Sequence, residues 1–345
     1  MGISRRAFLS TSSLAAAGIV SGRVFGAAAE PKNEQAFAWG SLIHLGRNLW
    51  AESSAVDHLR FDEELWRKLS ADYRACGVNM ILLDLAEGLV YPSHPELAVK
   101  GSWSADKLRD EIRRLRGMGF EVIPKVNLSA AHDTWLGPYE RMVSTQRYYE
   151  VVNDILRDVS EIFDRPRLFH LGWDEEEKDY FQKTYQITIM RQGDLWWNDL
   201  FRFADTVSGL GSRPWIWSDK VWYDRDEFYR KMPKSILQSP WFYGHKNTPV
   251  DPKATKDVVC YAEMAQAGFD VLPCGGNCYN NNDNFRQTAE YCRKNLPNER
   301  VKGFLFATWC ELTKKADKDK HGRTVAERHF ASSGQIAEAI KAWNS

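Results

Sequence analysis

The 345-residue sequence predicts a single-domain α/β protein of the (β/α)8, or TIM barrel, class. Two observations favour this class. Short apolar runs alternate with amphipathic segments along most of the chain, and glycines that end helices recur just before the apolar runs. Eight such β–α units in about 300 residues match the usual size of the barrel. A doubly wound open sheet is the alternative, but no glycine-rich phosphate loop follows the first strand.

Each apolar run is interpreted as a strand because it is short and bounded by turn-forming residues. The expected strands cover residues 37–45, 79–85, 121–126, 167–172, 214–218, 235–241, 269–273 and 303–309. Segments with apolar residues three and four positions apart predict helices between them. The clearest of these cover residues 62–76, 104–118, 145–163, 283–295 and 326–343, and Gly77, Gly119 and Gly211 are the expected helix-stop residues.

Residues 1–29 have the pattern of a twin-arginine signal peptide rather than of a folded segment. Arg5 and Arg6 precede a weakly apolar run over residues 14–20, and Ala27, Ala28 and Ala29 offer the small residues that a signal peptidase needs. The sequence therefore predicts export by the twin-arginine route to the periplasm or the medium. The mature domain would cover residues 30–345, and no later run is long enough to span a membrane.

Charge and cysteine content exclude several classes of partner. Removal of residues 1–29 leaves 43 basic and 46 acidic residues, a net charge of −3, which argues against nucleic acid. Cys274 and Cys278 are close in sequence, but no second pair or nearby histidine completes a zinc site. They are either a disulfide or two buried thiols. Neither a metal nor another cofactor is expected, and the sequence does not predict the oligomeric state.

Polar and aromatic residues follow the predicted strands, at the end where barrel enzymes keep their active sites. In chain order these residues are Arg47, Glu87, Asn127 with His132, Asp174 with Glu175, Asp219, Trp241, Asn277 with Tyr279, and Trp309 with Glu311. Asp174 and Glu175 are adjacent, and paired carboxylates are the usual groups that cleave glycosidic bonds. The simpler interpretation is that they begin the next helix, where its dipole favours acidic residues.

The same residues carry a resemblance to a known family. The sequence Phe-His-Leu-Gly-Trp-Asp-Glu at residues 169–175 resembles the H-x-G-G-D-E signature of glycoside hydrolase family 20, the β-N-acetylhexosaminidases. Residues 77–97 are similar to the second-strand region of that family, and residues 122–135 to its third-strand region. Trp309, Cys310 and Glu311 resemble the tryptophan–x–glutamate that closes its eighth strand. The similarity follows the family's order from about residue 40 to residue 311.

The resemblance implies a role for each matching residue. Glu175 would be the general acid, and Asp174 would orient the 2-acetamido group of the substrate, whose own oxygen attacks the anomeric carbon. Tyr279 would hydrogen-bond that oxygen, Trp241 and Trp309 would enclose the sugar ring, Arg47 and Glu311 would bind hydroxyl groups, and His132 would support the acid. The implied partner is an oligosaccharide or glycoconjugate, cleaved from its end.

Three departures from the family pattern concern the same region. Trp173 stands where the family has its second glycine, which would place an indole beside the acid pair and in contact with substrate. Lys125 and Asn127 stand where acidic residues are usual. Leu83 and Asp84 replace a tryptophan and a histidine. These changes leave the general acid in place and leave open whether the pocket requires an acetamido group.

Two other functions fit the same residues. A glycosidase of different sugar specificity would keep Glu175 as acid and use Asp219, Glu263 or Glu311 as nucleophile or base, with retaining or inverting stereochemistry set by their separation. A barrel that binds saccharides without cleaving them would need only the tryptophans.

Overall fold

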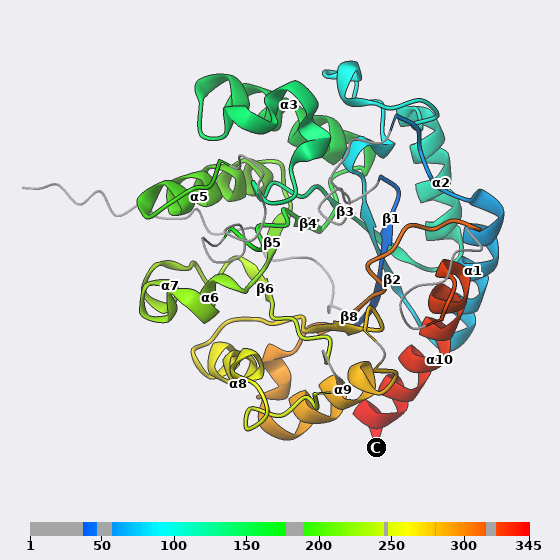
Figure 1. Ribbon diagram of the computed structural model, residues 1–345, viewed down its shortest axis with the longest axis vertical. Coiled ribbons are helices and arrows are strands. Elements are labelled where there is room, and N and C mark those ends of the chain that lie inside the picture. The colour runs from blue at the N-terminus through cyan, green and yellow to red at the C-terminus, as the bar shows by residue number, and fades with distance from the viewer. Residues whose placement is uncertain (1–36, 47–56, 177–188, 245–247, 280, 315–321) are drawn as a thin grey trace, which may run out of the picture. The chain divides into compact units, whose positions relative to one another are not determined.

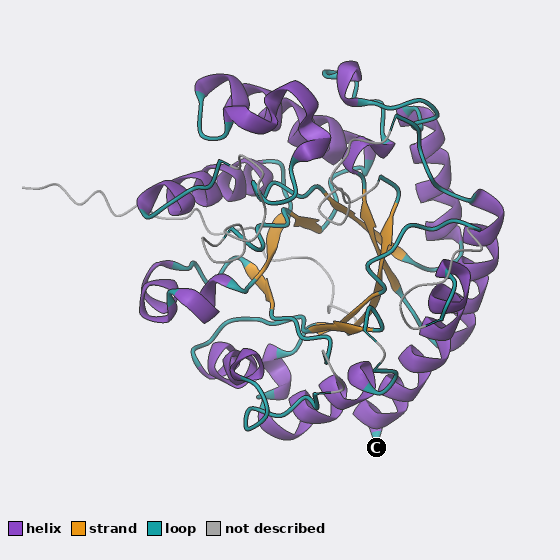
Figure 2. Cartoon of the chain, viewed as in Figure 1, coloured by secondary structure: helices purple, strands orange, loops and turns teal. Residues whose placement is uncertain are grey.

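The computed structural model describes residues 37–46, 57–176, 189–244, 248–279, 281–314 and 322–345. The signal peptide expected over residues 1–29 lies outside these ranges, as does Arg47. Figure 1 shows the described strands as a ring that helices surround, and Figure 2 shows the same arrangement by secondary structure. Among the described helices, none is both long and apolar enough to be a candidate membrane span.

The strands form one parallel eight-stranded sheet in the order β6-β5-β4-β3-β2-β1-β8-β7. Isolated bridges between Gln238 and Val271 and between Trp241 and Cys274 bring its two edges together. The predicted (β/α)8 barrel is therefore confirmed. The strands are β1 (Ala38–His44), β2 (Met80–Asp84), β3 (Glu121–Lys125), β4 (Leu168–His170), β5 (Arg213–Trp217), β6 (Leu237–Ser239), β7 (Cys274–Gly276) and β8 (Gly303–Ala307).

Five of the described helices that surround the barrel match the predicted amphipathic segments, and the four between residues 194 and 266 were not among those segments. Together they are α1 (Glu63–Cys76), α2 (Ala105–Gly117), α3 (Gln146–Ile162), α5 (Asp194–Gly209), α6 (Lys220–Tyr223), α7 (Arg225–Lys231), α8 (Val259–Gln266), α9 (Asn284–Asn295) and α10 (Val325–Asn344). Helix α1 shows why they form where they do. The side chain of Asp62 accepts the N–H of Leu65 at its start, and Gly77 ends it with a φ of 100°.

The seventh strand lies further along the chain than the sequence predicts. The expected run at residues 269–273 pairs only through isolated bridges of Val271, and the regular strand β7 begins at Cys274. Pro273 separates the two parts, and a proline has no N–H to donate to a β-ladder. The displacement moves the end of the strand closer to Tyr279.

Two layers of apolar side chains position the strand ends. The larger one fills the space between the strands and the helices. The smaller one fills the inside of the barrel, and Leu42, Leu82, Ile123 and Leu168 contribute to it from four consecutive strands. Because side chains alternate along a strand, the residue two positions after each of these also faces the interior, at the carboxyl end of the barrel.

Candidate active site

Four ionisable residues form one layer at the carboxyl ends of β1 to β4. His44 pairs in register with Asp84, Asp84 with Lys125, and Lys125 with His170. Each lies two positions after an interior apolar residue of its strand, so all four face the barrel axis. Their presence makes this half of the barrel polar directly below the strand ends.

Lys125 is a buried cation at the centre of this layer. Its side chain is 0% exposed, and its Nζ lies 2.6 Å from Oδ2 of Asp84. Nδ1 of His44 lies 3.0 Å from the same oxygen. Burial alone would raise the pKa of Asp84, but Lys125 and His44 lower it to about 2. Asp84 is therefore a permanent anion that compensates the buried lysine.

His170 is held between two indoles. Its ring centroid lies 4.7 Å from that of Trp215 and 4.5 Å from that of Trp217. The N–H of Gly172 donates to its Nδ1 over 2.9 Å. Burial and the nearby Lys125 keep its pKa well below the ordinary value, so the ring is neutral. Nδ1 accepts a hydrogen bond, and the proton of the neutral ring therefore sits on Nε2.

The loop after β4 is tightly folded. Gly172, Trp173 and Glu175 all have positive φ, at 75°, 78° and 59°. A Cβ at Gly172 would lie 2.0 Å from Oδ1 of Asn127, so only glycine fits there. Non-glycine residues in this region of φ are strained, and such strain persists only where surrounding contacts hold it. The loop is therefore a constrained element that presents the acid pair in one arrangement.

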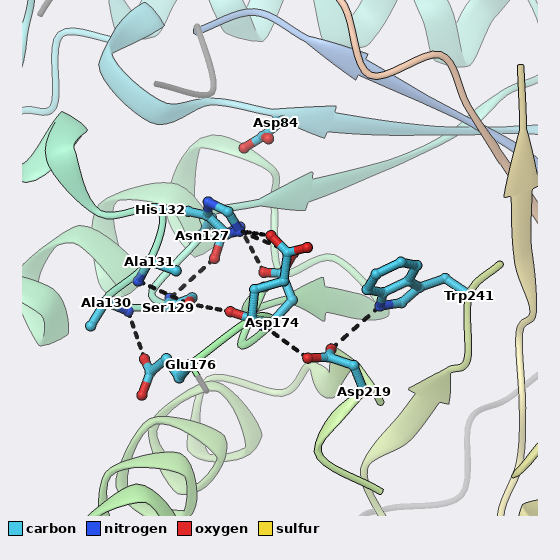
Figure 3. A network of polar contacts seen from close by, with 12 residues as sticks. Asp84, Asn127, Ser129, Ala130, Ala131, His132, Asp174, Glu176, Asp219 and Trp241 are labelled. Carbon is cyan, nitrogen blue, oxygen red and sulfur yellow. Dashed lines mark hydrogen bonds and ion pairs between the residues drawn. The ribbon is translucent and has the colours of Figure 1, made fainter. Parts of the chain in front are cut away.

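Asp174 is the fixed member of the pair. It is 5% exposed, and its Oδ1 accepts a hydrogen bond of 3.0 Å from Nδ2 of Asn127 (Figure 3). The hydroxyl of Ser129 donates to its backbone carbonyl. Burial alone would raise the pKa of Asp174, but His132, Lys125 and Asn127 lower it below the ordinary value. Asp174 is an ionised, immobilised acceptor at neutral pH.

Glu175 is the accessible member of the pair. Its side chain is 22% exposed, against 8% for Asp174. Nε2 of His132 lies 3.1 Å from Oε2 of Glu175 and 3.4 Å from Oδ2 of Asp174. Burial would lower the pKa of His132, but the two carboxylates raise it to about 10. The imidazole is therefore a cation shared by both acids.

Asp219, which follows β5, is the third carboxyl of the cluster. Its Oδ2 accepts the N–H of Glu175 over 2.8 Å, and its Oδ1 accepts Nε1–H of Trp241 over 3.3 Å (Figure 3). Burial and the charges of Asp174 and Glu175 raise its pKa to about 8. A carboxyl that keeps its proton at neutral pH is a poor nucleophile or base, so Asp219 instead links the acid loop to the next strand.

Glu176 points away from the pair and anchors the loop. It accepts the N–H of Ala130 over 2.6 Å and pairs with Arg191, which is also bonded to Asp199 of α5 over 2.7 Å. Charges buried in this way are retained when each has a partner. The contact joins the loops after β3 and β4 to the helical layer. The simpler interpretation from the sequence was that the acidic residues begin the next helix. In the structure the described residues Asp174, Glu175 and Glu176 lie in a loop instead.

The position of Trp173 corrects the sequence-based expectation. Its indole is 1% exposed and packs against Trp196 and Phe203 of α5, with the guanidinium of Arg191 4.5 Å from the ring centroid. The tight turn after β4 directs this side chain outward, into the layer between barrel and helices. The indole therefore lies outside the barrel mouth, away from the face where the strand ends converge.

Aromatic side chains occupy the mouth beside β5 to β8. Trp241 stacks on Tyr243 at 5.5 Å between centroids, and Tyr243 lies edge-on to Trp309 at 6.1 Å. Trp217 is 5.7 Å from Trp309. Sequence reasoning named Trp241 and Trp309 but missed Trp217, which ends β5. Its position two residues after the inward-facing Trp215 was the available signal. Together they make an aromatic wall, defined as Trp217, Trp241, Tyr243 and Trp309.

The remaining predicted site residues differ in how closely they approach the cluster. Tyr279 is half-buried against the interior layer, and burial, Cys278 and Glu175 raise its pKa. Glu311 lies with Oε1 3.4 Å from Nη1 of Arg60. Glu263, the other alternative base, pairs with Arg225 of α7 and lies in the helical layer instead of the mouth.

One group of described side chains has the spacing of a metal site. One ligand atom each from His132, Asp174 and Glu175 lies within 4.8 Å of the others. With no ion bound, the raised pKa of His132 makes the trio an imidazolium between two acids. A metal ion would bind there only in exchange for that proton. The six cysteines are free thiols, so Cys274 and Cys278 form no disulfide with each other.

Ionisable and aromatic side chains that converge at the carboxyl ends of parallel strands place the chain among the (β/α)8 barrel enzymes. The family model described as "Glycosyl hydrolase family 20, catalytic domain" matches residues 124–331, which is more than half of the chain. The chain therefore belongs to glycosyl hydrolase family 20.

Individual relatives agree with this membership. A curated beta-hexosaminidase of Emericella nidulans is 23% identical over an alignment of 283 residues, and the match covers 68% of this chain and 45% of that protein. Solved structures of similar fold include a beta-N-acetylhexosaminidase from Bacteroides fragilis NCTC 9343, with a TM-score of 0.60, 15% identity and coverage of 88% of this chain and 65% of that one. Another is a GH20 exo beta-N-acetylglucosaminidase from Vibrio harveyi in complex with N-acetylglucosamine, with a TM-score of 0.56, 12% identity and coverage of 89% and 58%. The chain thus spans about half the length of the curated relative.

Proposed function

We propose that the chain is an exo-acting glycoside hydrolase that removes β-linked N-acetylhexosamine residues, with Glu175 as general acid and Asp174 as the group that orients the 2-acetamido substituent. The observation that carries this proposal is the unequal pair itself. Asp174 is buried, ionised and hydrogen-bonded, whereas Glu175 is partly exposed and faces the imidazolium of His132. An orienting group must be fixed, and a proton donor must reach the leaving oxygen.

Asp174 has the properties needed to hold an acetamido N–H. Each carboxylate oxygen can accept two hydrogen bonds, and Asn127 uses one position on Oδ1. The acetamido N–H would bind a remaining position, which turns the acetamido oxygen toward the anomeric carbon. Tyr279 would donate its hydroxyl proton to that oxygen. Attack by the substrate's own oxygen then replaces the enzyme nucleophile used by most glycosidases.

His132 would make the proton transfer by Glu175 favourable. When Glu175 gives its proton to the leaving oxygen, a carboxylate is left 3.1 Å from Nε2 of the imidazolium. A charged hydrogen bond of this kind stabilises the developing anion without reorganisation of the site. In the second step Glu175 would take a proton from the water that opens the cyclic intermediate, which returns the acid to its starting state.

The aromatic wall would bind the sugar ring. Sugar rings present apolar C–H faces that stack on indoles, and the polar half of the mouth would receive the hydroxyls. With Trp173 directed outward, the side chain that departs from the family pattern does not fill the space an acetamido group needs. Arg47, which lies outside the described residues, and Glu311 remain proposed partners of ring hydroxyls.

A carboxylate nucleophile or base is the second candidate mechanism. Asp219 lies beside Glu175, but its raised pKa disfavours the ionised form, and Glu263 lies in the helical layer. These positions favour the substrate-assisted route. A barrel that only binds saccharides would have no need for a strained loop that fixes an acid pair. Export by the twin-arginine route, with action in the periplasm or the medium, is part of the same proposal and rests on residues 1–29.

The function is tested by Glu175→Gln on aryl β-N-acetylglucosaminides. Loss of general acid catalysis is expected to lower kcat by about 10²–10⁴ on the 4-nitrophenyl substrate. The loss should be smaller on the 2,4-dinitrophenyl substrate, because its leaving group needs less protonation. Glu338→Gln, at an exposed residue of α10, is the matched control.

Two results would overturn the assignment of the acid. One is an unchanged kcat in the variant, and the other is an equal loss on both leaving groups. If the wild-type chain and the variants hydrolysed no aryl glycoside but still bound the substrate, the saccharide-binding alternative would be favoured.

A further inference from the structure

Cys310 lies in an arrangement that the proposed hydrolysis does not use. It stands between Trp309 and Glu311 in the loop after β8, and its side chain is partly exposed. Its Sγ lies 3.4 Å from Nε2 of His329, a residue of α10 that is 1% exposed. The same Nε2 lies 3.1 Å from the carbonyl oxygen of Glu311, and Nδ1 lies 3.4 Å from Oγ1 of Thr308. A thiol and an imidazole in contact are the elements of an activated nucleophile.

A guanidinium lies beside this pair. Arg328 is 8% exposed and donates through Nη2 to the carbonyl of Thr308. Its Nε has no hydrogen-bond partner among the described residues, and its charge acts on Cys310. A buried guanidinium with an unused donor favours an anion nearby. The thiolate of Cys310 is the anion that the chain itself can supply.

Other groups that face the thiol do not oppose this ionisation. The loop after β7 contributes Cys278 and α1 contributes Tyr73, and burial raises the pKa of each to about 12, so both stay neutral. Burial would also raise the pKa of Cys310, but His329 and Arg328 outweigh it and lower the value to about 7. The partly exposed Cys76 provides the contrast, because burial raises its pKa and no cation offsets the effect.

We propose that Cys310 is a modification site: a thiolate, paired with His329, that reacts with peroxides and small electrophiles, and whose modification disables the sugar pocket through Trp309. The thiolate sulfur attacks one oxygen of hydrogen peroxide, an S–O bond forms as the O–O bond breaks, and the departing hydroxide takes a proton and leaves as water. Sulfur loses two electrons and the peroxide gains them, which gives a sulfenic acid.

The effect on the pocket follows from the position of the thiol. Trp309 has a φ of 49°, a strained conformation that the neighbouring contacts must hold. Contact of His329 with the Glu311 carbonyl is one of them. An oxygen or an alkyl group added to Sγ would enter the 3.4 Å space between Cys310 and His329 and displace the turn. This part of the inference rests on the proposed function, whereas the reactivity of the thiol does not.

Reactivity is tested first, on the folded full chain, with iodoacetamide at pH 5.5–9.5 and peptide mass mapping. At pH 7 Cys310 is expected to be alkylated about tenfold faster than Cys76, after allowance for the weaker nucleophilicity of a low-pKa thiolate. Its rate should rise with a midpoint near pH 7. His329→Gln keeps an N–H for the Glu311 carbonyl but removes the imidazole, and should slow Cys310 toward the rate of Cys76, with Arg328 retaining part of the effect.

The proposed reactivity would be overturned by equal alkylation rates at Cys310 and Cys76 at pH 7, or by a midpoint above pH 9 for Cys310 in the wild-type chain. This comparison within the wild-type chain holds even if the His329 variant does not fold.

The second experiment treats the wild-type chain and Cys310→Ser with hydrogen peroxide and measures aryl N-acetylglucosaminide hydrolysis. Untreated Cys310→Ser should match the wild type, and only the wild type should lose activity. Equal loss in both would contradict the effect on the pocket. A chain without hydrolytic activity would refute the proposed function and leave the labelling result to decide on the thiol.

Discussion

The two halves of the barrel mouth differ in chemistry. Strands β1 to β4 end in side chains that hold charge, of which Lys125 and Asp84 are a buried ion pair and His132 bridges Asp174 to Glu175. Strands β5, β6 and β8 end in the aromatic wall. The polar half arranges protons and charges, and the aromatic half offers flat apolar surface of the kind that binds a sugar face.

The boundary between the halves is a short chain of hydrogen bonds. Asp219 accepts the N–H of Glu175 on one side and Nε1–H of Trp241 on the other. The acid and the wall are thereby held at a fixed separation by one neutral carboxyl. The difference between the halves implies that substitutions in the polar half should lower kcat or stability, whereas substitutions in the aromatic half should raise KM.

Within the comparison of the two halves, the largest effect on kcat is expected from Asp174→Asn. The amide keeps the shape of the side chain but loses the charge that holds the acetamido N–H in the transition state. Loss of one such preorganised partner costs about 10²–10³ in kcat, with KM little changed. Steady-state kinetics on an aryl N-acetylglucosaminide measure it, with Asp194→Asn at an exposed residue of α5 as control. A change confined to KM would contradict the assigned role.

Lys125→Met should also have a large effect, but on the stability of the fold. It leaves Asp84 as a buried carboxylate without its main partner, a change that costs about 3–5 kcal/mol in the free energy of unfolding. Urea unfolding measures it. Lys68→Met, which removes an exposed pair with Glu64 on α1, should cost about 0.5 kcal/mol at most. The double variant Lys125→Met/Asp84→Leu should recover part of the loss, and an equal cost in single and double variants would refute the pairing.

Trp309→Ala tests the aromatic half. Loss of a stacking partner is worth about 0.5–1.5 kcal/mol beyond the loss of buried area, so KM should rise roughly tenfold with kcat less affected. Trp343→Ala removes an indole that packs on Phe37 outside the barrel, and should lower stability without a change in KM. If both variants changed KM alike, the wall would not be the sugar site.

The fourth prediction concerns the boundary residue and the pH dependence of stability. Because the pKa of Asp219 is about 8 in the folded chain and 3.8 without perturbation, the folded state holds a proton that the unfolded state releases between these values. Stability therefore falls as pH rises through that window, and Asp219→Asn should reduce the fall in Tm between pH 5 and pH 9. The raised pKa of His132 contributes a further fall from pH 6.5 to 10 in both chains.

The exposed Asp226 of α7 supplies the control for this measurement, because Asp226→Asn should leave the pH dependence as it is in the wild type. An Asp219→Asn variant with the wild-type slope would show that this carboxyl is ionised in the folded chain, and the boundary would then be a charged one.

The sequence predicted the barrel because strand and helix periods are local properties that survive without tertiary information. It missed what depends on register. Lys125, Asp84 and His44 are distant in sequence, and only the pairing of β1, β2 and β3 makes them one charge layer. The seventh strand was displaced because hydrophobicity does not report that Pro273 interrupts the ladder.

Side-chain direction was the other difficulty at the site. Trp173 was expected at the substrate because it adjoins Asp174, yet the tight turn after β4 directs its indole into the helical layer. Trp217 was overlooked because a tryptophan inside an apolar strand is indistinguishable from a core residue until its place at the strand end is known. Roles in catalysis depend on angles and distances to a substrate, which no pattern in the chain contains.

The requirement for a 2-acetamido group tests the central claim most directly. The kcat/KM of the wild-type chain is to be measured on 4-nitrophenyl β-N-acetylglucosaminide and on 4-nitrophenyl β-glucoside. If the substrate's own oxygen is the nucleophile, the acetamido substrate should be favoured by at least about 10³-fold, because a well-placed intramolecular group has a very high effective molarity. Comparable hydrolysis of the two substrates would contradict substrate-assisted catalysis and require a carboxylate of the chain in its place.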